Sequence, residues 1–476
     1  MRPARSNDPR DYLIVALDFP TKNEALTAAK SLQGLVRYVK VGLELYIVGG
    51  PAIVAKLVAM GFEVMLDLKL HDIPETMARA TAALRGLGPS LFTVHASAAT
   101  NGLRAAAERK GPMLQLGVTA LTSHDDRACG EAYNVGRHAT VMNLANIASD
   151  GGCDGIVCAP GDVETLLRYF PHLFPVVPSI RLPAEGTQDQ AMAGSPENAL
   201  AAGARFLVVG RPITRPEDEI PPADACRRML GHIEAGIAVY RDRRNQEREA
   251  LFETLFQIGA VKIAAEGEPG FAIKSTPVDG IRSPIYLNLR TPENKNGPLT
   301  PEIVTRIAAE MGGLPLVREG EFDAIVGIPE AGAPLAEALR KHTSPTKRVP
   351  VALVKEGEGD RRRIAAFVPT WKTAADGTAE THTLPPGSRI LLVDDLVTKA
   401  LTKEEAIAAI VNAGCVVAGI ALFADRGQGG LAELNAKGIR TEAVVHLPTI
   451  IQERRDAGLL PANDAQRVLA YLSGAS

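Results

Sequence analysis

Cysteine is scarce in this 476-residue chain, and the cysteines present form no recognisable framework. The five are Cys129, Cys153, Cys158, Cys226 and Cys415; no two form a CxxC pair, and none has metal-type spacing with a histidine. A sparse, odd set is typical of reduced thiols, so the sequence predicts a cytoplasmic protein without a disulfide framework or a cysteine-bound metal.

Long apolar runs and an excess of one charge are also missing. No apolar stretch approaches the roughly 18 residues of a membrane span, and the start of the chain lacks the apolar core of a signal peptide. The formal net charge is -3, so no basic surplus points to nucleic acid or to a membrane surface. We therefore expect neither a nucleic-acid nor a membrane partner, and any phosphate must bind at a local site.

The first half of the chain alternates short apolar runs with longer amphipathic stretches. Each run is apolar throughout, as expected for parallel strands that are buried on both faces. The predicted strands are residues 12–17, 38–41, 63–68, 91–94, 113–118, 155–158, 174–179 and 205–209. Eight strand–helix units favour a (β/α)₈ barrel, with an open doubly wound sheet as the alternative from periodicity alone.

A charged run at residues 241–249 separates this half from a second one. We predict a barrel domain at 1–240, a linker at 241–250 and a second domain at 251–476. Later strands are predicted at 323–326, 350–354, 390–393, 416–422 and 441–445, with helical stretches between them, which favours an open parallel α/β sheet. Residues 370–387, rich in Thr, Ala, Gly and Pro, are predicted to form a loop.

Charged residues follow several predicted strands of the first half. The third strand runs into Asp67 and Lys69, which share a face because they are two apart, and Asp72 follows on the loop. Lys40 ends the second strand and Asp18 the first. The carboxyl ends of barrel strands form the mouth where barrel active sites lie. The sequence therefore predicts a charged site at this mouth.

Gly210 and Arg211 follow the eighth predicted strand, where barrels commonly bind phosphate. Taken singly, a Gly-Arg pair is usually a turn, and an Asp-x-Lys at a strand end is more often a surface ion pair. Their occurrence together, in barrel order, predicts a site for a phosphorylated substrate.

On these residues the stretch 10–240 resembles the orotidine 5′-phosphate decarboxylase family. The resemblance rests on Asp67-x-Lys69-x-x-Asp72 preceded by Lys40, and on Thr122 and Arg181 after the fifth and seventh strands. It implies conversion of orotidine 5′-monophosphate (OMP) to uridine 5′-monophosphate (UMP) and carbon dioxide, with no cofactor and no metal. It also implies a homodimer or a higher homo-oligomer.

The resemblance implies a role for each matching residue. Asp67 would crowd the substrate carboxylate, Lys69 would protonate C6, and Asp72 would reach into the partner subunit's site. The implied catalytic residues are Lys69, Asp67, Asp72 and Lys40. The implied contacts to OMP or UMP are Asp18, Lys40, Ile73, Thr76, Thr122, Arg181, Gln190, Gly210 and Arg211.

Elementary chemistry agrees with those roles. Loss of carbon dioxide without a metal leaves a carbanion, which preorganised ammonium groups in a dry pocket stabilise. Alternating lysines and aspartates keep such a cluster near neutral and hold each lysine charged. The rival is a barrel of the same superfamily that acts on a sugar phosphate through a divalent metal, and sensitivity to chelators would distinguish the two.

The stretch 250–476 resembles orotate phosphoribosyltransferase, so the chain resembles a UMP synthase fusion with the decarboxylase first. Asp394 and Asp395 end a buried strand and precede Thr398, which suits the hydroxyls and phosphate of a phosphoribosyl group, although such a pair can also cap a helix. The residues implied to bind phosphoribosyl pyrophosphate (PRPP) or orotate, with Mg²⁺ on the pyrophosphate, are Lys274, Lys355, Asp394, Asp395, Thr398 and Arg426.

Several positions of this half depart from the family pattern. Ala400 stands where the phosphate loop normally has glycine, and Glu358 and Ala331 stand at positions of lysines. Departure of pyrophosphate needs positive charge on the leaving group. The sequence therefore favours a degenerate transferase domain, which could still bind a nucleotide or serve in assembly. A fully active bifunctional enzyme stays open, because arginines at 361–363 could compensate.

Overall fold

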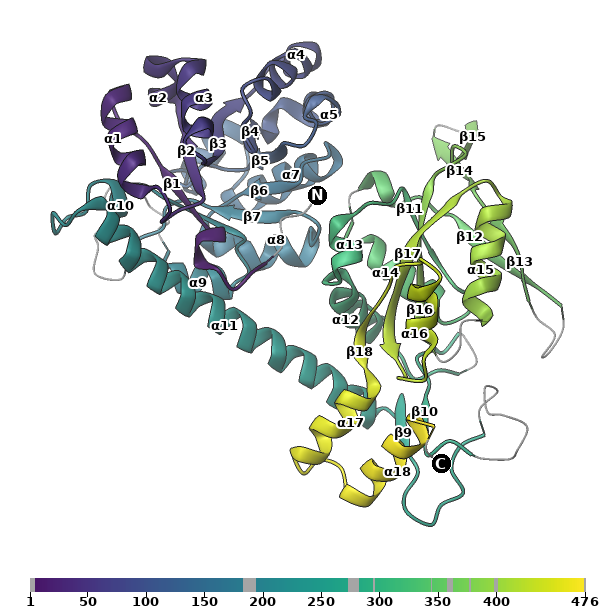
Figure 1. The fold of residues 1–476 in the computed structure, drawn as a ribbon. Helices are drawn as coiled ribbons and strands as arrows, with labels where there is room; N and C mark the ends of the chain where they lie inside the picture. Colours follow the sequence, from purple (N-terminus) through teal and green to yellow (C-terminus); the bar gives the residue numbers. More distant parts are fainter. Residues whose placement is uncertain are drawn as a thin grey trace. The chain divides into compact units, whose positions relative to one another are not determined.

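The computed structural model describes residues 5–182, 194–272, 282–293, 296–343, 345–357, 363–375, 378–397 and 401–474. The chain forms two compact units, Met1–Asn245 and Gln246–Ser476 (Figure 1). Helix α11, Pro222–Gln257, contains the boundary, so the charged run 241–249 is helical. The assignment of 241–250 as a linker stays a prediction. Within the described residues, no helix combines the length and the apolar character needed to cross a membrane.

The first unit is a closed barrel of eight parallel strands in sequence order, which confirms the predicted fold. The strands are β1 Leu13–Ala16, β2 Tyr38–Val41, β3 Glu63–Leu70, β4 Leu91–His95, β5 Leu114–Val118, β6 Gly155–Val157, β7 Phe174–Val177 and β8 Phe206–Val209. The surrounding helices are α1 Lys22–Leu32, α2 Leu43–Gly49, α3 Pro51–Ala59, α4 Pro74–Arg85, α5 Ala99–Arg109, α6 Asp126–Tyr133, α7 Arg137–Asp150, α8 Val163–Tyr169, α9 Pro196–Ala201 and α10 Arg211–Thr214.

Aromatic side chains fill the amino-terminal end of the barrel. Tyr38, Phe174 and Phe206 are the first residues of β2, β7 and β8. Their rings pack edge to face, with centroids 5.1 Å apart for Tyr38–Phe206 and 5.9 Å apart for Phe174–Phe206. This packing leaves the carboxyl-terminal mouth as the open end.

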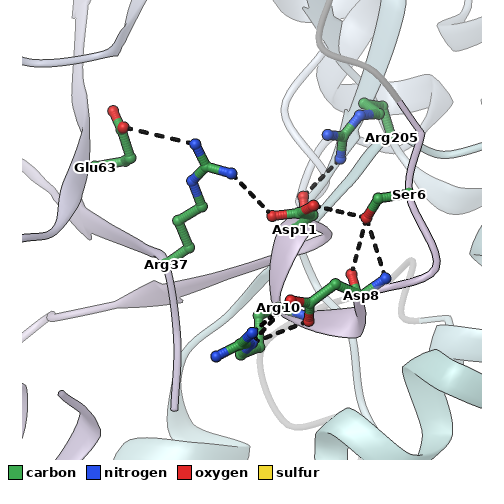
Figure 2. A network of polar contacts seen from close by, with 7 residues as sticks. All are labelled: Ser6, Asp8, Arg10, Asp11, Arg37, Glu63 and Arg205. Carbon is green, nitrogen blue, oxygen red and sulfur yellow. Dashed lines mark hydrogen bonds and ion pairs between the residues drawn. The ribbon is translucent and has the colours of Figure 1, made fainter. Parts of the chain in front are cut away.

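A polar network fastens the first residues of the chain to this amino-terminal end (Figure 2). The carboxylate of Asp11 accepts hydrogen bonds from Ser6 Oγ at 2.6 Å and from Arg37 Nη1 at 3.1 Å. Arg205 Nη1 donates to the Asp11 carbonyl at 2.6 Å, and burial lowers the pKa of this arginine to about 10. The network is structural, because it lies at the end of the barrel remote from the mouth.

The second unit contains the predicted open parallel sheet, in the order β11-β16-β17-β18. The strands are β11 Ala324–Gly327, β16 Arg389–Val397, β17 Val416–Asp425 and β18 Thr441–His446. Its helices are α12 Pro301–Gly312, α13 Pro315–Glu319, α14 Gly332–Arg340, α15 Leu401–Asn412, α16 Gly430–Ala436, α17 Leu447–Asp456 and α18 Ala462–Leu472 (Figure 1). Alternate residues of β16 face opposite layers: Leu391 packs with α12 and α14, whereas Leu392 packs with α15.

Two predictions for this unit were wrong. The strand predicted at 350–354 does not join the parallel sheet; β12, Ala352–Glu356, pairs antiparallel with β13, Arg363–Val368. The predicted loop at 370–387 contains a hairpin of β14, Thr370–Ala375, and β15, Thr378–Thr383. Threonine and the single tryptophan favour strands, and Trp371 stacks on His382 directly opposite, so cross-strand packing outweighs the loop-like composition. A short antiparallel pair, β9 Val261–Ile263 and β10 Ile285–Leu287, lies earlier in the unit.

Candidate active site

A cavity of about 590 Å³ opens at the carboxyl ends of the barrel strands. This volume lies in the range of sites for small molecules. Its lining includes these predicted residues: Asp18, Lys40, Asp67, Lys69, Thr122, Arg181, Gly210 and Arg211. The barrel therefore gathers side chains that are nearly 200 residues apart in the sequence around one space.

Four of these side chains form an alternating chain of charges. Lys40 Nζ lies 3.1 Å from Asp18 Oδ1 and 3.5 Å from Asp67 Oδ2. Lys69 Nζ lies 3.0 Å from both carboxylate oxygens of Asp67. Gly42 leaves room for this arrangement, because a Cβ there would come within 2.9 Å of Asp18 Oδ1 and 3.0 Å of Lys40 Nζ.

The charges of the cluster hold one another ionised. Burial opposes ionisation of Asp67, but Lys40 and Lys69 outweigh it, so the pKa of Asp67 lies below its usual value. Burial likewise disfavours charged Lys40, yet Asp67 and Asp18 keep the pKa of Lys40 above its usual value. The cluster therefore combines a buried carboxylate with ammonium groups at neutral pH.

Arginines also line the cavity. Arg181 is buried and donates from Nη1 to the Ile180 carbonyl at 2.9 Å. Gly210 is the N-cap residue of α10, which begins at Arg211. Arg215 also lines the cavity, and its guanidinium lies over the Phe19 ring, 5.4 Å from the centroid. Sequence reasoning missed Arg215, although its spacing of four residues from Arg211 was the available signal.

Thr122 and Ser179 join two loops of the mouth. Ser179 Oγ donates to Thr122 Oγ1 at 3.0 Å, and both residues line the cavity. Ser179 has a φ of 65°, a conformation that costs a non-glycine residue free energy. Sequence reasoning also missed Ser179, because neither its φ nor its partner is visible in the local sequence.

Three predicted residues lie away from the cavity within a single chain. Asp72, Ile73 and Thr76 are not among the described residues that line it. Asp72 is exposed, and its Oδ1 accepts a hydrogen bond from the Ile73 N–H at 2.7 Å. Gln190, which was also predicted to contact the substrate, lies outside the described residues.

The candidate site of the second unit is organised around Asp394, near the end of β16. Lys403 Nζ donates to Asp394 Oδ2 and to the Leu396 carbonyl, each at 2.7 Å. The Lys403 and Asp394 side chains are each only 8% exposed. Asp394 Oδ1 accepts from the Asp395 N–H at 3.0 Å, so both oxygens of this carboxylate have partners. Burial and the neighbouring Asp394 raise the pKa of Asp395 well above its usual value.

The other residues predicted to form the transferase site are not seen in contact with Asp394 among the described residues. Arg426 is buried after β17, donates to Ser283 Oγ at 3.2 Å and has its pKa lowered by burial. Lys355 lies on β12. Lys274 and Thr398 lie outside the described residues. Sequence reasoning missed Lys403, whose ion pair depends on how α15 packs against β16.

Comparison with known proteins gives a family to each half. Residues 11–228 match the orotidine 5′-phosphate decarboxylase / HUMPS family, and residues 297–443 match the phosphoribosyl transferase domain. Orotidine 5′-phosphate decarboxylase of Parasynechococcus marenigrum (strain WH8102) is 41% identical over 249 residues, which cover 49% of this chain and 100% of that protein. The same-named protein of Dichelobacter nodosus (strain VCS1703A) is 40% identical over 231 residues, covering 46% of this chain and 98% of that protein.

The chain therefore belongs to the orotidine 5′-phosphate decarboxylase family, with a phosphoribosyltransferase domain fused after the barrel. The structure of Leishmania donovani UMP synthase covers 98% of this chain and 98% of its own, with 22% identity and a TM-score of 0.51. That likeness concerns the fold, and it extends over both halves.

Proposed function

We propose that the barrel decarboxylates OMP to UMP and carbon dioxide without a cofactor. The observation that carries the proposal is the alternating cluster of Lys40, Asp67 and Lys69 on the wall of the cavity. A buried carboxylate flanked by ammonium groups suits a reaction in which a substrate carboxylate leaves and negative charge develops on carbon.

In the proposed mechanism, Asp67 and Lys69 act on the two ends of the breaking bond. The ionised Asp67 repels the substrate carboxylate, which favours loss of carbon dioxide. The C6–carboxylate bond breaks and its electron pair stays on C6, where the Lys69 ammonium stabilises it. Lys69 Nζ then gives a proton to C6 to form UMP, and the neutral amine takes a proton back from solvent.

Binding of the remote phosphate holds the reacting end in place. Arg181 and Arg211, which line the cavity, are proposed to bind the phosphate, and Arg215 also lines the cavity. Interactions with a non-reacting group can be used to orient the substrate and so raise the rate of the chemical step. Asp18 and Lys40 would bind the ribose, and Thr122 the pyrimidine.

We propose that the barrel acts as a homodimer in a cytoplasmic location. Asp72 and the 66%-exposed Ile73 lie on the loop after β3, and α2 carries an exposed apolar stripe of Leu43, Ile47 and Val48. A second copy of the chain would cover these side chains and bring Asp72 to the partner's cavity. This accounts for a predicted catalytic carboxylate that lies outside the cavity of its own chain.

For the second unit we propose a phosphoribosyltransferase-like domain without transferase turnover. A carboxylate can accept about four hydrogen bonds, so the contacts of Asp394 with Lys403 and with the Asp395 N–H leave acceptor sites for ribose hydroxyls. The proposal rests instead on Glu358 and Ala331, which stand where the family has lysines, because pyrophosphate departure needs positive charge. The carboxylates of Asp394 and Asp395 are oxygen ligands of the kind that Mg²⁺ prefers, although Lys403 is ion-paired with Asp394 and burial raises the pKa of Asp395. In this proposal the domain binds a nucleotide or serves in assembly of the protein.

One assay of the purified full chain tests both proposals. Release of carbon dioxide from OMP is expected, together with its loss in a Lys69→Ala variant; a fully active variant would refute the proposed mechanism. Orotate, PRPP and Mg²⁺ are supplied in parallel, and no orotate consumption is expected. Consumption of orotate would instead establish a bifunctional enzyme whose missing cations have been replaced.

A further inference from the structure

The strand that carries Asp67 and Lys69 is irregular where these residues occur. β3 pairs with β4 at Leu66–Phe92 and again only at Leu70–Val94. Four residue steps on β3 therefore match two on β4, so the segment between Leu66 and Leu70 bulges out of the ladder. Bulges re-aim side chains, and here the bulge turns Asp67 and Lys69 into the cavity.

This bulge has a cost in backbone conformation and hydrogen bonding. Lys69 has a φ of 52°, which is unfavourable for a residue with a Cβ. The displaced segment also loses regular ladder partners for its N–H groups, and a buried N–H without a partner is costly. The bulge therefore needs a hydrogen-bond acceptor that the strand pairing does not provide.

Thr93, in the middle of β4, provides this acceptor. Its Oγ1 accepts a hydrogen bond from the Lys69 N–H at 2.8 Å and donates to Asp67 Oδ1 at 2.9 Å. Thr93 is only 1% exposed and does not line the cavity among the described residues. A single hydroxyl thus connects the backbone of one member of the charged pair with the carboxylate of the other.

We propose that Thr93 is a positioning residue for the decarboxylation, acting through Asp67 and Lys69 without touching the substrate. The inference rests on the proposed function of the barrel. Without the hydroxyl, the bulge loses its cross-strand hydrogen bond, and the Lys69 ammonium and the Asp67 carboxylate are no longer held at their present separation. Because the arginines at the phosphate end are not altered, substrate affinity changes much less than the rate of the chemical step.

The test compares Thr93→Ser with Thr93→Ala in the full chain, with Thr93→Val as a third variant. Serine and alanine both lack the threonine methyl group, so they differ only in the hydroxyl. The measurements are kcat and KM for release of carbon dioxide from OMP, the Kd of UMP by calorimetry, and the unfolding temperature. The unsubstituted chain is measured in parallel.

The serine variant is expected to keep kcat within about 3-fold of the unsubstituted chain, since it keeps both hydrogen bonds. The alanine variant is expected to lose roughly 10- to 100-fold in kcat, as for a misplacement of about 1 Å, with a much smaller change in the Kd of UMP. Equal kcat values for serine and alanine would overturn the proposal, as would a loss confined to KM. If the unsubstituted chain releases no carbon dioxide, the proposed function itself fails.

Discussion

At the scale of single residues, the two units use buried charge in opposite ways. In the barrel, Asp67 has two ammonium partners and borders a cavity, so its charge can act on a ligand. In the second unit, Asp394 and Lys403 satisfy each other inside the protein. Removing one partner of a buried pair leaves an uncompensated charge, whereas an ionised carboxylate that borders a cavity can also act on a ligand.

Neutralising the two adjacent aspartates of β16 is expected to have opposite effects on stability at pH 7. Asp394→Asn removes the partner of buried Lys403 and should cost about 3–5 kcal/mol of unfolding free energy. Asp395→Asn should stabilise the protein, because the raised pKa of Asp395 makes its ionisation in the folded state unfavourable. The free energy of unfolding of both variants is measured by chemical denaturation, with a spectroscopic signal from the second unit reporting the unfolding.

The effect of Asp395→Asn on stability should depend on pH, and this dependence is the control. Burial and Asp394 raise the pKa of Asp395 in the folded chain to about 7, whereas an aspartate in the unfolded chain has a pKa near 3.9. Between these two pH values the folded chain binds more protons than the unfolded chain, so stability falls as the pH rises from about 4 to 7. The gain from Asp395→Asn should therefore disappear below about pH 4, where both states are protonated. A gain that persists unchanged at that pH would contradict the explanation.

Arg215 is expected to act on the substrate's phosphate. A hydrogen bond to a charged group contributes about 1.5–3 kcal/mol, so Arg215→Ala should lower kcat/KM for OMP by roughly 10- to 100-fold. Orotidine, which has no phosphate, should be decarboxylated equally by both proteins. Arg10→Ala is the matched control, because Arg10 lies in the network remote from the mouth. An equal loss with orotidine would remove Arg215 from the phosphate site.

At the scale of elements, the strand ends and the first residues after them carry the side chains proposed to perform the chemistry. β3 supplies the charged pair through its bulge, and β4 stabilises that bulge through Thr93. The loops after β5 and β7 meet through Thr122 and Ser179. Helix α2 contributes an exposed apolar surface, because Leu43 and Ile47 are one helical turn apart and these residues are 54% and 78% exposed.

A substitution on helix α2 should therefore disrupt the proposed dimer. Ile47→Asp places a charge in the apolar stripe and is expected to convert a dimer into monomers, as measured by light scattering after gel filtration. Val239→Asp on α11 is the control, because Val239 is also an exposed apolar residue but lies outside the stripe. A dimer that survives Ile47→Asp would place the interface elsewhere.

At the scale of the whole molecule, the proposed catalytic role of Asp72 predicts active sites that are shared between two chains. Asp72 lies on the loop that leaves β3 and is absent from the described lining of its own cavity. In a two-fold dimer the same surface faces itself, so each chain can lend Asp72 to the other. Each subunit would then depend on its partner for one carboxylate.

Mixing two inactive variants is expected to restore activity. Lys69→Ala and Asp72→Asn should each abolish release of carbon dioxide alone. In a mixed dimer one site would carry both defects and the other site neither, so activity should return after subunit exchange. No recovery, with mixed dimers present by native mass spectrometry, would show that Asp72 acts within its own chain or not at all.

Much of the barrel and its site follows from the sequence alone. Eight apolar runs separated by amphipathic stretches predict the strand order, because parallel strands buried on both faces leave a simple pattern. Charged residues immediately after those runs must lie at one mouth, and the cavity does contain Asp18, Lys40, Asp67 and Lys69. The threonine-rich hairpin was mispredicted, because pairing between strands depends on cross-strand contacts more than on composition.

Only the tertiary structure decided how these groups are held. The hydroxyl of Thr93 meets Lys69 across 24 residues because β3 and β4 slip out of register, and no local pattern records that slip. Lys403 looks like an ordinary helix residue until α15 packs against β16 and buries its ammonium beside Asp394. The sequence by itself determined which residues reach the strand ends; register and packing decided their partners, because hydrogen bonds and ion pairs form between atoms that only the folded chain brings within about 3 Å.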